Sequence, residues 1–136
     1  MGQSYNSNMR AAAHRHLQAG AHLRTAHRDV AGYLFGIAAE CALKRLMIAS
    51  GMRPLPETER RDDPFYAHFE LLKSMLRNMA SGRLATELRR FAEDSAFMQY
   101  WDISIRYSDG RDVRPAWVEH WHQNAKDAIG IMDTYA

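Results

Sequence analysis

Residues 29–50, DVAGYLFGIAAECALKRLMIAS, decide the fold, because they are apolar on nearly every side of a helix. A helix with apolar residues all round must be covered on most sides, so this segment predicts the central helix of a helical bundle. Gly32, Gly36 and Glu40 fall on one face at four-residue spacing. The two glycines cost helix propensity and therefore predict close approach of a neighbouring helix. Gly51 is expected to end the segment as a C-terminal glycine.

The same periodicity divides the rest of the chain into further helices. Ser7 is expected to cap a first helix over residues 7–27, and Asp29 to cap the central one. The polar segment 52–64 contains two internal prolines and predicts a loop. Further helices are expected over residues 65–79, 83–106 and 115–135, and residues 1–6 are expected to be loose. The pattern predicts a single all-α domain, residues 1–136, folded as an antiparallel four- to five-helix bundle.

The composition is that of an ordinary soluble globular protein. Of 136 residues, 46% are hydrophobic and 25% charged, and the formal net charge is only +2. This balance lacks the basic excess that is typical of nucleic-acid binding. Arginines and histidines concentrate in the first 30 residues, where they form either an anion-facing surface or a solvated helix face.

The single cysteine, Cys41, lies inside the apolar segment and cannot form a disulfide within one chain. It is expected to act as a small buried hydrophobe, which favours a reducing, cytoplasmic location. No charge-free run is long enough for a membrane span, and no secretory signal is evident.

Two short motifs carry a family resemblance. Residues 38–44 read AAECALK and residues 106–109 read RYSD. Together they resemble the HEPN domain family, small all-α proteins tied to nucleotides and RNA. The resemblance covers about residues 11–132 and implies an HEPN-like bundle, a homodimer, and a small nucleotidyltransferase as a partner that restrains the protein.

The resemblance also implies a catalytic pair. HEPN ribonucleases carry an arginine and, after four to six residues, a histidine at the start of the last helix. Arg114 and His120 have this spacing, although Pro115 departs from the polar residue that usually follows the arginine. His120 would act as general base or acid on the ribose 2′-hydroxyl and the leaving oxygen. Arg114 would hold the phosphate, and no metal or cofactor is required.

The ordinary interpretation of this pair stays open. An arginine and a histidine at this spacing occur by chance, and Arg114 can be a solvated loop residue. His120 and His122 are expected on opposite edges of the apolar stripe of the last helix. The candidate binding residues are Glu40, Lys44, Arg106, Tyr107, Asp109 and His122.

Glu40 requires a partner, because a buried unpaired carboxylate is costly. It either pairs with Lys44 along its own helix or reaches Arg106 from a later one and fixes the cleft. The histidines of the first helix have no four-residue spacing, so no zinc site is expected.

Three functions follow from these observations. The first is a metal-independent endoribonuclease of a toxin–antitoxin or defence system. The second is a non-catalytic module of the same fold that binds a nucleotide, RNA or a nucleotidyltransferase. The third is a structural interaction domain. Tyr33, Trp117 and Trp121 offer more aromatic area than one small bundle readily buries, which predicts a two-fold homodimer with the last helix near the axis.

Overall fold

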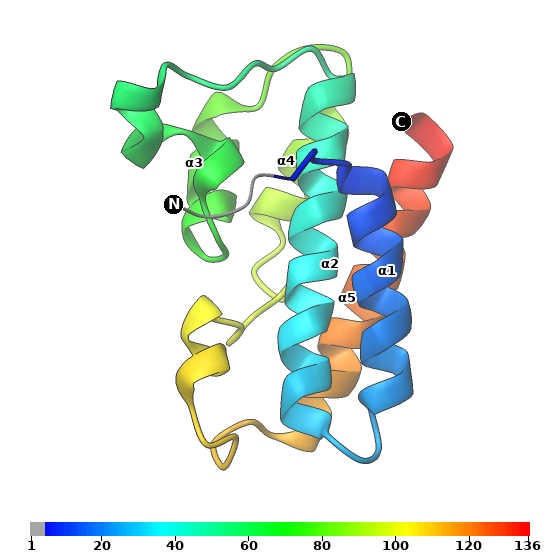
Figure 1. Ribbon diagram of the computed structural model, residues 1–136. Coiled ribbons are helices and arrows are strands. Elements are labelled where there is room, and N and C mark those ends of the chain that lie inside the picture. The colour runs from blue at the N-terminus through cyan, green and yellow to red at the C-terminus, as the bar shows by residue number, and fades with distance from the viewer. Residues whose placement is uncertain (1–4) are drawn as a thin grey trace.

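The computed structural model describes residues 5–136, and in that range the chain is all-helical, without a strand (Figure 1). The prediction of an all-α fold is confirmed. The α-helices are α1 (Met9–Leu23), α2 (Arg28–Ala49), α3 (Leu71–Met79), α4 (Ala85–Glu93) and α5 (Pro115–Tyr135). Short 3₁₀ helices lie between them: η1 (Glu57–Asp62), η2 (Pro64–Tyr66) and η3 (Ile103–Tyr107).

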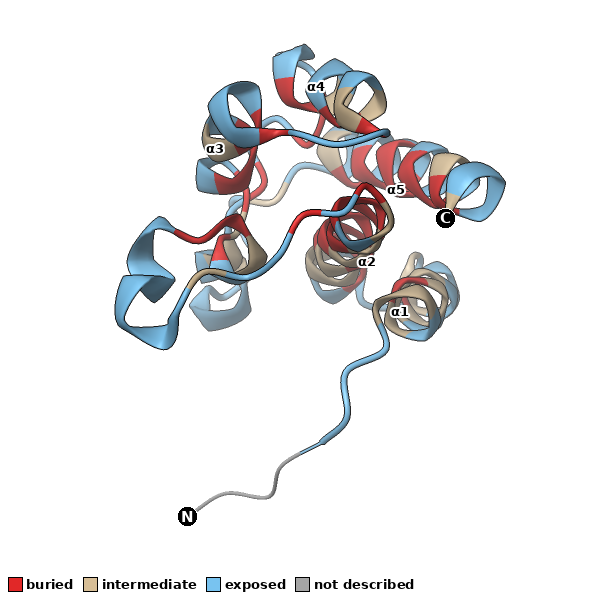
Figure 2. Ribbon diagram, turned by 90° about the horizontal axis from the view of Figure 1, so that it is seen from above, coloured by how far each residue is buried: buried red, intermediate tan, exposed pale blue. Residues whose placement is uncertain are grey.

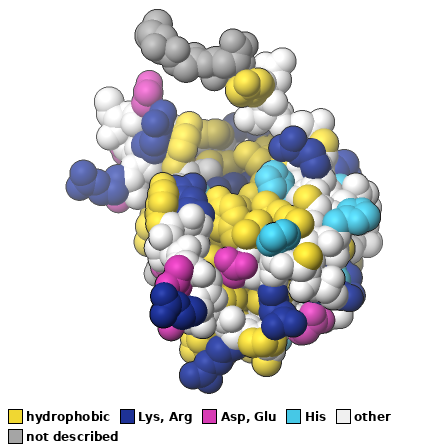
Figure 3. Space-filling model, turned by 60° about the horizontal axis from the view of Figure 1, so that its bottom comes forward, with side chains coloured by type: hydrophobic (Ala, Val, Ile, Leu, Met, Phe, Trp, Pro, Cys, Tyr) yellow, Lys and Arg dark blue, Asp and Glu magenta, His cyan; other side chains and the backbone are white. Residues whose placement is uncertain are grey.

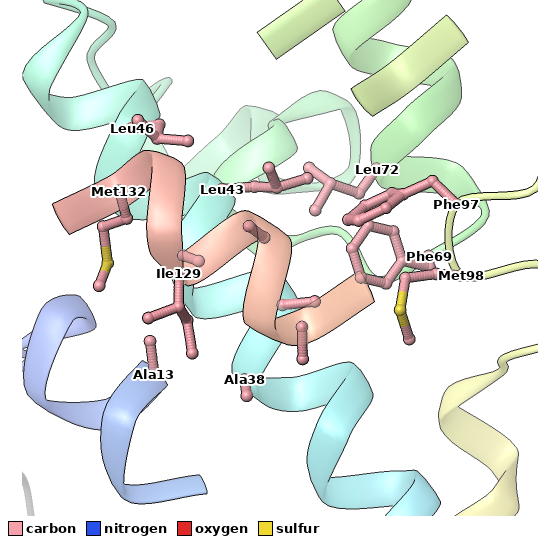
Figure 4. Close-up of a cluster of buried hydrophobic side chains, with 14 of the residues drawn as sticks. Ala13, Ala38, Leu43, Leu46, Phe69, Leu72, Phe97, Met98, Ile129 and Met132 are labelled. Atoms are coloured by element: carbon pink, nitrogen blue, oxygen red, sulfur yellow. The ribbon is translucent and has the colours of Figure 1, made fainter. Parts of the chain in front are cut away.

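Helix α2 is the centre of the structure, as its apolar sequence predicts. Figure 2 shows buried residues around much of α2, whereas α5 buries one side and α1 is mostly half-buried or exposed. Side chains of α2, α5, α3 and the segments that flank α3 and α4 meet in one continuous core (Figure 4). Its members include Leu43, Leu46, Phe69, Leu72, Phe97, Met98, Ile129 and Met132.

The prediction of an antiparallel bundle is wrong for one pair of helices. Helix α1 is antiparallel to α5, because Arg10 near the start of α1 pairs with Asp133 near the end of α5 at 2.7 Å. Helices α2 and α5 run parallel, and the Arg45 guanidinium donates to the Ala136 carbonyl, so their C-terminal ends lie together (Figure 1). Residues 50–114 connect the C-terminal end of α2 to the N-terminal end of α5. Because this connection runs back along the length of α2, α5 can start beside the N-terminal end of α2 and run parallel to it.

The predicted close approach of a neighbouring helix is confirmed at Gly32 and is wrong at Gly36, where a residue outside the helices makes the contact. A Cβ atom at Gly32 would lie 2.9 Å from the Trp121 ring of α5, and one at Gly36 would overlap the Trp101 indole. Trp101 comes from a turn and not from a helix, and its Nε1–H donates to the Gly32 carbonyl at 3.0 Å. The glycines thus let two tryptophans reach the α2 backbone.

The N-cap residues of α1 and α2 differ from the predicted ones, whereas the glycine that ends α2 is as predicted. Asn8, not Ser7, caps α1, and its side chain accepts from the Ala11 N–H. His27, not Asp29, precedes α2, and it makes no side-chain cap bond. At the other end Gly51 has φ +95°, as expected for a C-terminal glycine, because that left-handed conformation favours residues without a Cβ.

The predicted helix over 83–106 is wrong beyond residue 93. Asp94 has an extended backbone and ends α4. The buried ammonium of Lys73 on α3 binds the carbonyls of Asp94 and Phe97, each at 2.8 Å. These bonds stabilise a turn over 94–102 although its apolar residues have helical spacing. Residues 103–107 then form only the 3₁₀ helix η3.

The predicted helix over 65–79 is also shorter than expected, because α3 begins at Leu71 after η2 and a break. The polar segment 52–64 contains η1 and no α-helix. Its end is closed by the buried Asp63 carboxylate, which accepts from the N–H groups of Leu55 and Phe65. Of the expected loose N-terminus, residues 1–4 lie outside the described part of the chain, and residues 5 and 6 are not helical.

Candidate functional site

The start of α5 presents a stack of one arginine and two aromatic rings, here called the α5 stack. The Arg114 guanidinium carbon lies 5.1 Å from the centroid of the Trp117 ring. Trp117 stacks on Tyr100 with centroids 4.7 Å apart and planes 28° from parallel. Tyr100 is 60% exposed and has φ +71°, which is unusual for a residue with a side chain. A flat, partly exposed surface of this kind can accept another planar group.

Three side chains of α5 hold the turn that carries Tyr100. The Asn124 carbonyl oxygen accepts from the Met98 N–H, and Trp121 Nε1–H donates to the Gln99 carbonyl, both at 2.8 Å. His120 Nε2 lies 2.7 Å from the Ala96 carbonyl oxygen. A carbonyl can only accept, so Nε2 carries the hydrogen and donates it. Bonds to three of the four residues that precede Tyr100 therefore hold its strained position.

The structure places Arg114 and His120 near this turn but does not join them. Arg114 is the N-cap residue of α5 and lies over Trp117. His120 is exposed and bonded to the Ala96 backbone. Within residues 5–136 no hydrogen bond links the two side chains. The pair retains one free imidazole nitrogen, Nδ1 of His120, and one exposed guanidinium.

The RYSD residues form an exposed edge next to α2. The Arg106 guanidinium lies 5.0 Å from the Tyr107 ring centroid, and Tyr107 is 80% exposed. Arg106 also lines a small cavity of about 190 Å³ with Tyr33 of α2. Asp109 forms an ion pair with Arg111 at 3.0 Å. Within the described part of the chain no hydrogen bond or ion pair joins Arg106 to Glu40, whose partners are His68 and Phe69, so that alternative is wrong.

Glu40 is buried, and its partner is a residue that the sequence did not suggest. One Glu40 oxygen accepts from His68 Nδ1 at 2.8 Å, and the other accepts from the Phe69 N–H at 2.9 Å. No direct ion pair between Glu40 and Lys44 forms within residues 5–136, although the charge of Lys44 still acts on the Glu40 carboxyl. Burial raises the pKa of the Glu40 carboxyl, against the lowering effects of His68, Lys44 and the Phe69 N–H. The one sequence signal for His68 is the need of a buried acid for some donor.

His122 is built into the core and does not lie at its edge. It is 8% exposed and stacks on Phe35 with ring centroids 4.4 Å apart. Arg24, the C-cap residue of α1, donates to His122 Nδ1 at 2.8 Å, and its Nε lies 3.6 Å from a carboxylate oxygen of Glu119. Burial, followed by the charges of Lys126 and Arg24, lowers the pKa of His122. The imidazole thus joins α1, α2 and α5.

Positive and negative side chains alternate on the surface that Figure 3 shows, and hydrophobic side chains gather in its middle. A single-sign basic face is not visible there. Within residues 5–136 no helix is long and apolar enough to cross a membrane. No cluster of three or more metal-ligating His, Cys, Asp or Glu residues occurs in the same range.

Comparison with known proteins provides no relative on which to base a function: no protein-family model, no curated protein and no solved structure matches the chain.

Proposed function

We propose that this chain is a helical module that binds single-stranded RNA or nucleotides at the α5 stack. The main support for this proposal is that Arg114 lies over the Trp117 ring and that Trp117 stacks on Tyr100. This arrangement leaves aromatic and guanidinium surface exposed to solvent. Bases stack on such surfaces without sequence preference, and each stacked base contributes about 1–3 kcal/mol. Stacking also suits a chain whose net charge is only +2, because phosphate contacts alone would supply little affinity.

The binding interpretation is favoured over the ribonuclease one by the setting of His120. A general base or acid must reach the ribose hydroxyl or the leaving oxygen. The Nε2–H of His120 is instead committed to the Ala96 carbonyl, and this bond fixes the turn below Tyr100. The same bond explains why a histidine lies there without catalysis.

The proposal includes the finer features that the HEPN resemblance implies. These are an HEPN-like arrangement of the helices, a two-fold homodimer with α5 near the axis, a nucleotidyltransferase as partner, and a cytoplasmic location.

The aromatic argument for the dimer is weaker than the sequence suggested. Trp121 is fully buried within one chain, and Tyr33 stacks on Trp101 at 6.1 Å. Light scattering at micromolar concentration tests the dimer directly.

Fluorescence anisotropy with a 5′-labelled ten-nucleotide oligouridine in EDTA tests the function. Tyr100→Ser removes one stacking surface and should weaken binding by roughly tenfold or more. Arg114→Ala should weaken it to a similar extent and reduce the salt dependence. Arg111→Ala is the matched control, because Arg111 lies in the same loop but is occupied by Asp109.

Binding that is absent, or equal in all four proteins, rejects the proposal. A denaturing gel of the same mixtures shows whether RNA is cut. Cleavage that disappears with His120→Ala would restore the ribonuclease hypothesis.

A further inference from the structure

A groove between α4 and α5 forms a cavity that is separate from the α5 stack (Figure 2). It has a volume of about 560 Å³, which is within the range of small-molecule sites. Its apolar lining consists of Phe91 of α4 and of Gly130 and Ile131 of α5, and both of these side chains are half-buried. The other lining residues are polar: Glu87, Arg90, Lys126, Asp127 and Thr134.

Gly130 is a helix-interior glycine for which the described part of the molecule provides no packing reason. A Cβ atom there would meet no atom within 4 Å, whereas one at Gly32 or Gly36 would meet a tryptophan ring. A glycine in a helix interior lowers stability relative to alanine. Because Gly130 lines the groove and leaves the α5 backbone uncovered, a ligand can lie directly against that backbone.

The two ends of the groove differ in charge, because α4 and α5 run antiparallel. Arg83, which precedes α4, donates to the Tyr135 carbonyl at the end of α5 at 3.0 Å. The turn that follows α4 donates an N–H to Asn124 of α5. The later part of α4 therefore lies beside the middle of α5, and this brings Arg90 and Lys126 to the same end of the groove, one from each helix.

These two cations are available to a ligand. Both side chains are exposed, and within residues 5–136 neither Arg90 nor Lys126 forms a hydrogen bond or an ion pair through its side chain. Asp127 lies at the same end but accepts from the Gln123 amide at 2.8 Å. Glu87 lies one turn toward the other end, and its Oε2 is buried and thus closed to a ligand on the surface of the groove. Two cations and one acid leave a net charge of +1 at this end, which one carboxylate would neutralise.

We propose that the groove between α4 and α5 binds a small amphiphile that has a carboxylate head and an apolar tail. The head lies between Arg90 and Lys126, which donate to its oxygens. The tail lies along Gly130 and covers the Phe91 and Ile131 side chains, so that apolar surface is removed from water.

The groove is independent of the proposed RNA-binding surface. Nine residues of α5 separate Trp117 of the α5 stack from Lys126, which corresponds to about 14 Å along the helix. From Lys126 to Thr134 the helix rises about 12 Å, so the groove has room for an alkyl chain of medium length.

Amide NMR titration of the isotope-labelled full chain tests the proposal. Octanoate is the probe, acetate has the same head without the tail, and octylamine has the same tail with the opposite charge. Octanoate should shift the amides of Phe91, Gly130 and Ile131 in a saturable way. Acetate should not saturate at the same concentrations, because it leaves the apolar lining uncovered, and octylamine should bind more weakly.

Variants of the two cations and of the glycine locate the ligand. Arg90→Gln and Lys126→Gln should each weaken octanoate binding by about twofold to fivefold, the effect of one exposed ion pair. Gly130→Leu should abolish binding, because its side chain occupies the groove, and circular dichroism checks that the chain remains helical. Arg89→Gln is the matched control, since Arg89 neighbours Arg90 but donates to the Ala80 carbonyl, outside the groove.

Two further variants separate this site from its alternatives. Glu87→Gln should bind octanoate at least as tightly as the wild type, because it removes a negative charge from the groove. Arg114→Ala should bind it as the wild type does, so a failure of RNA binding leaves this result unaffected. The proposal is overturned if octanoate shifts no amide of the groove, if octylamine binds as tightly as octanoate, or if the double variant of Arg90 and Lys126 binds like the wild type.

Discussion

Helices α2 and α5 run parallel, and each contains glycine and glutamate residues. These residues are closely packed or buried in α2 but open or exposed in α5. In α2, Gly36 lies under Trp101 and Glu40 is buried, whereas in α5, Gly130 faces open space and Glu119 is exposed. The difference follows from position, because α2 is covered on most sides and α5 on one (Figure 2). Polar groups in α2 must therefore be satisfied within the molecule or by a ligand. Those on the exposed side of α5 are free to form a binding surface, whereas His122 and Asn124 on its buried side have partners inside the molecule.

Substitution of the two glycines is the strongest test of this comparison. Gly36→Ala should destabilise the fold by about 3–4 kcal/mol, because the new methyl displaces Trp101 and breaks its bond to the Gly32 carbonyl. The gain of helix propensity, about 1 kcal/mol, is too small to offset this loss. Gly130→Ala meets no atom within 4 Å and should stabilise the protein by about 0.5–1 kcal/mol. Urea denaturation measures both, and equal signs would contradict the comparison.

The two glutamates provide the second test. Glu40→Ala leaves the Phe69 N–H and His68 Nδ1 without their acceptor and should cost about 2–3 kcal/mol. Glu119→Ala removes a 3.6 Å ion pair of an exposed side chain and should change stability by less than about 0.5 kcal/mol. The midpoints of chemical denaturation give both values. A mild effect at Glu40 would mean that the Glu40–His68 pair is dispensable for the fold.

The same contrast explains which parts of the fold the sequence could predict. The apolar run of α2 and the Pro115 start of α5 are local signals, and both helices lie where they predicted. The turn over 94–102 is not a local feature. Phe97 and Trp101 have helical spacing, but Lys73 from α3 and His120 from α5 bind the turn's carbonyls. Tertiary bonds of this kind override helical periodicity and leave no mark in a short window of sequence.

The candidate site was predictable to a similar degree. The position of Arg114 at the start of α5 follows from the proline after it. The partner of Glu40 did not follow, because His68 is 28 residues away and lies in a break between η2 and α3. The need for a donor is a property of one residue, whereas the identity of that donor is a property of the fold.

The third test concerns the histidine at the surface of α5. His120→Ala removes the bond to the Ala96 carbonyl and should cost about 1 kcal/mol, since the carbonyl can still bind water. It should also weaken oligouridine binding, because the turn that positions Tyr100 loses one of its three α5 contacts. Arg114→Ala should weaken binding with little loss of stability. Loss of binding by His120→Ala with an unchanged turn, as judged by NMR shifts of residues 96–101, would instead indicate direct contact with RNA.

The smallest expected effect is a pH dependence from His122, the buried histidine of α5. Burial and nearby cations lower its pKa below the ordinary value of 6.5. The unfolded chain then binds a proton more readily than the folded one between the two pKa values, so stability is complete above pH 6.5 and declines as the pH falls through this window. The difference in the free energy of unfolding between wild type and His122→Gln should narrow from pH 7.5 to pH 5.

Arg24→Met should raise the His122 pKa in an NMR titration, because it removes one of the cations that disfavour the imidazolium. If the difference in unfolding free energy between wild type and His122→Gln did not change with pH, the imidazole would be as hydrated in the folded as in the unfolded chain. That result would contradict the observed stacking of His122 on Phe35 of α2.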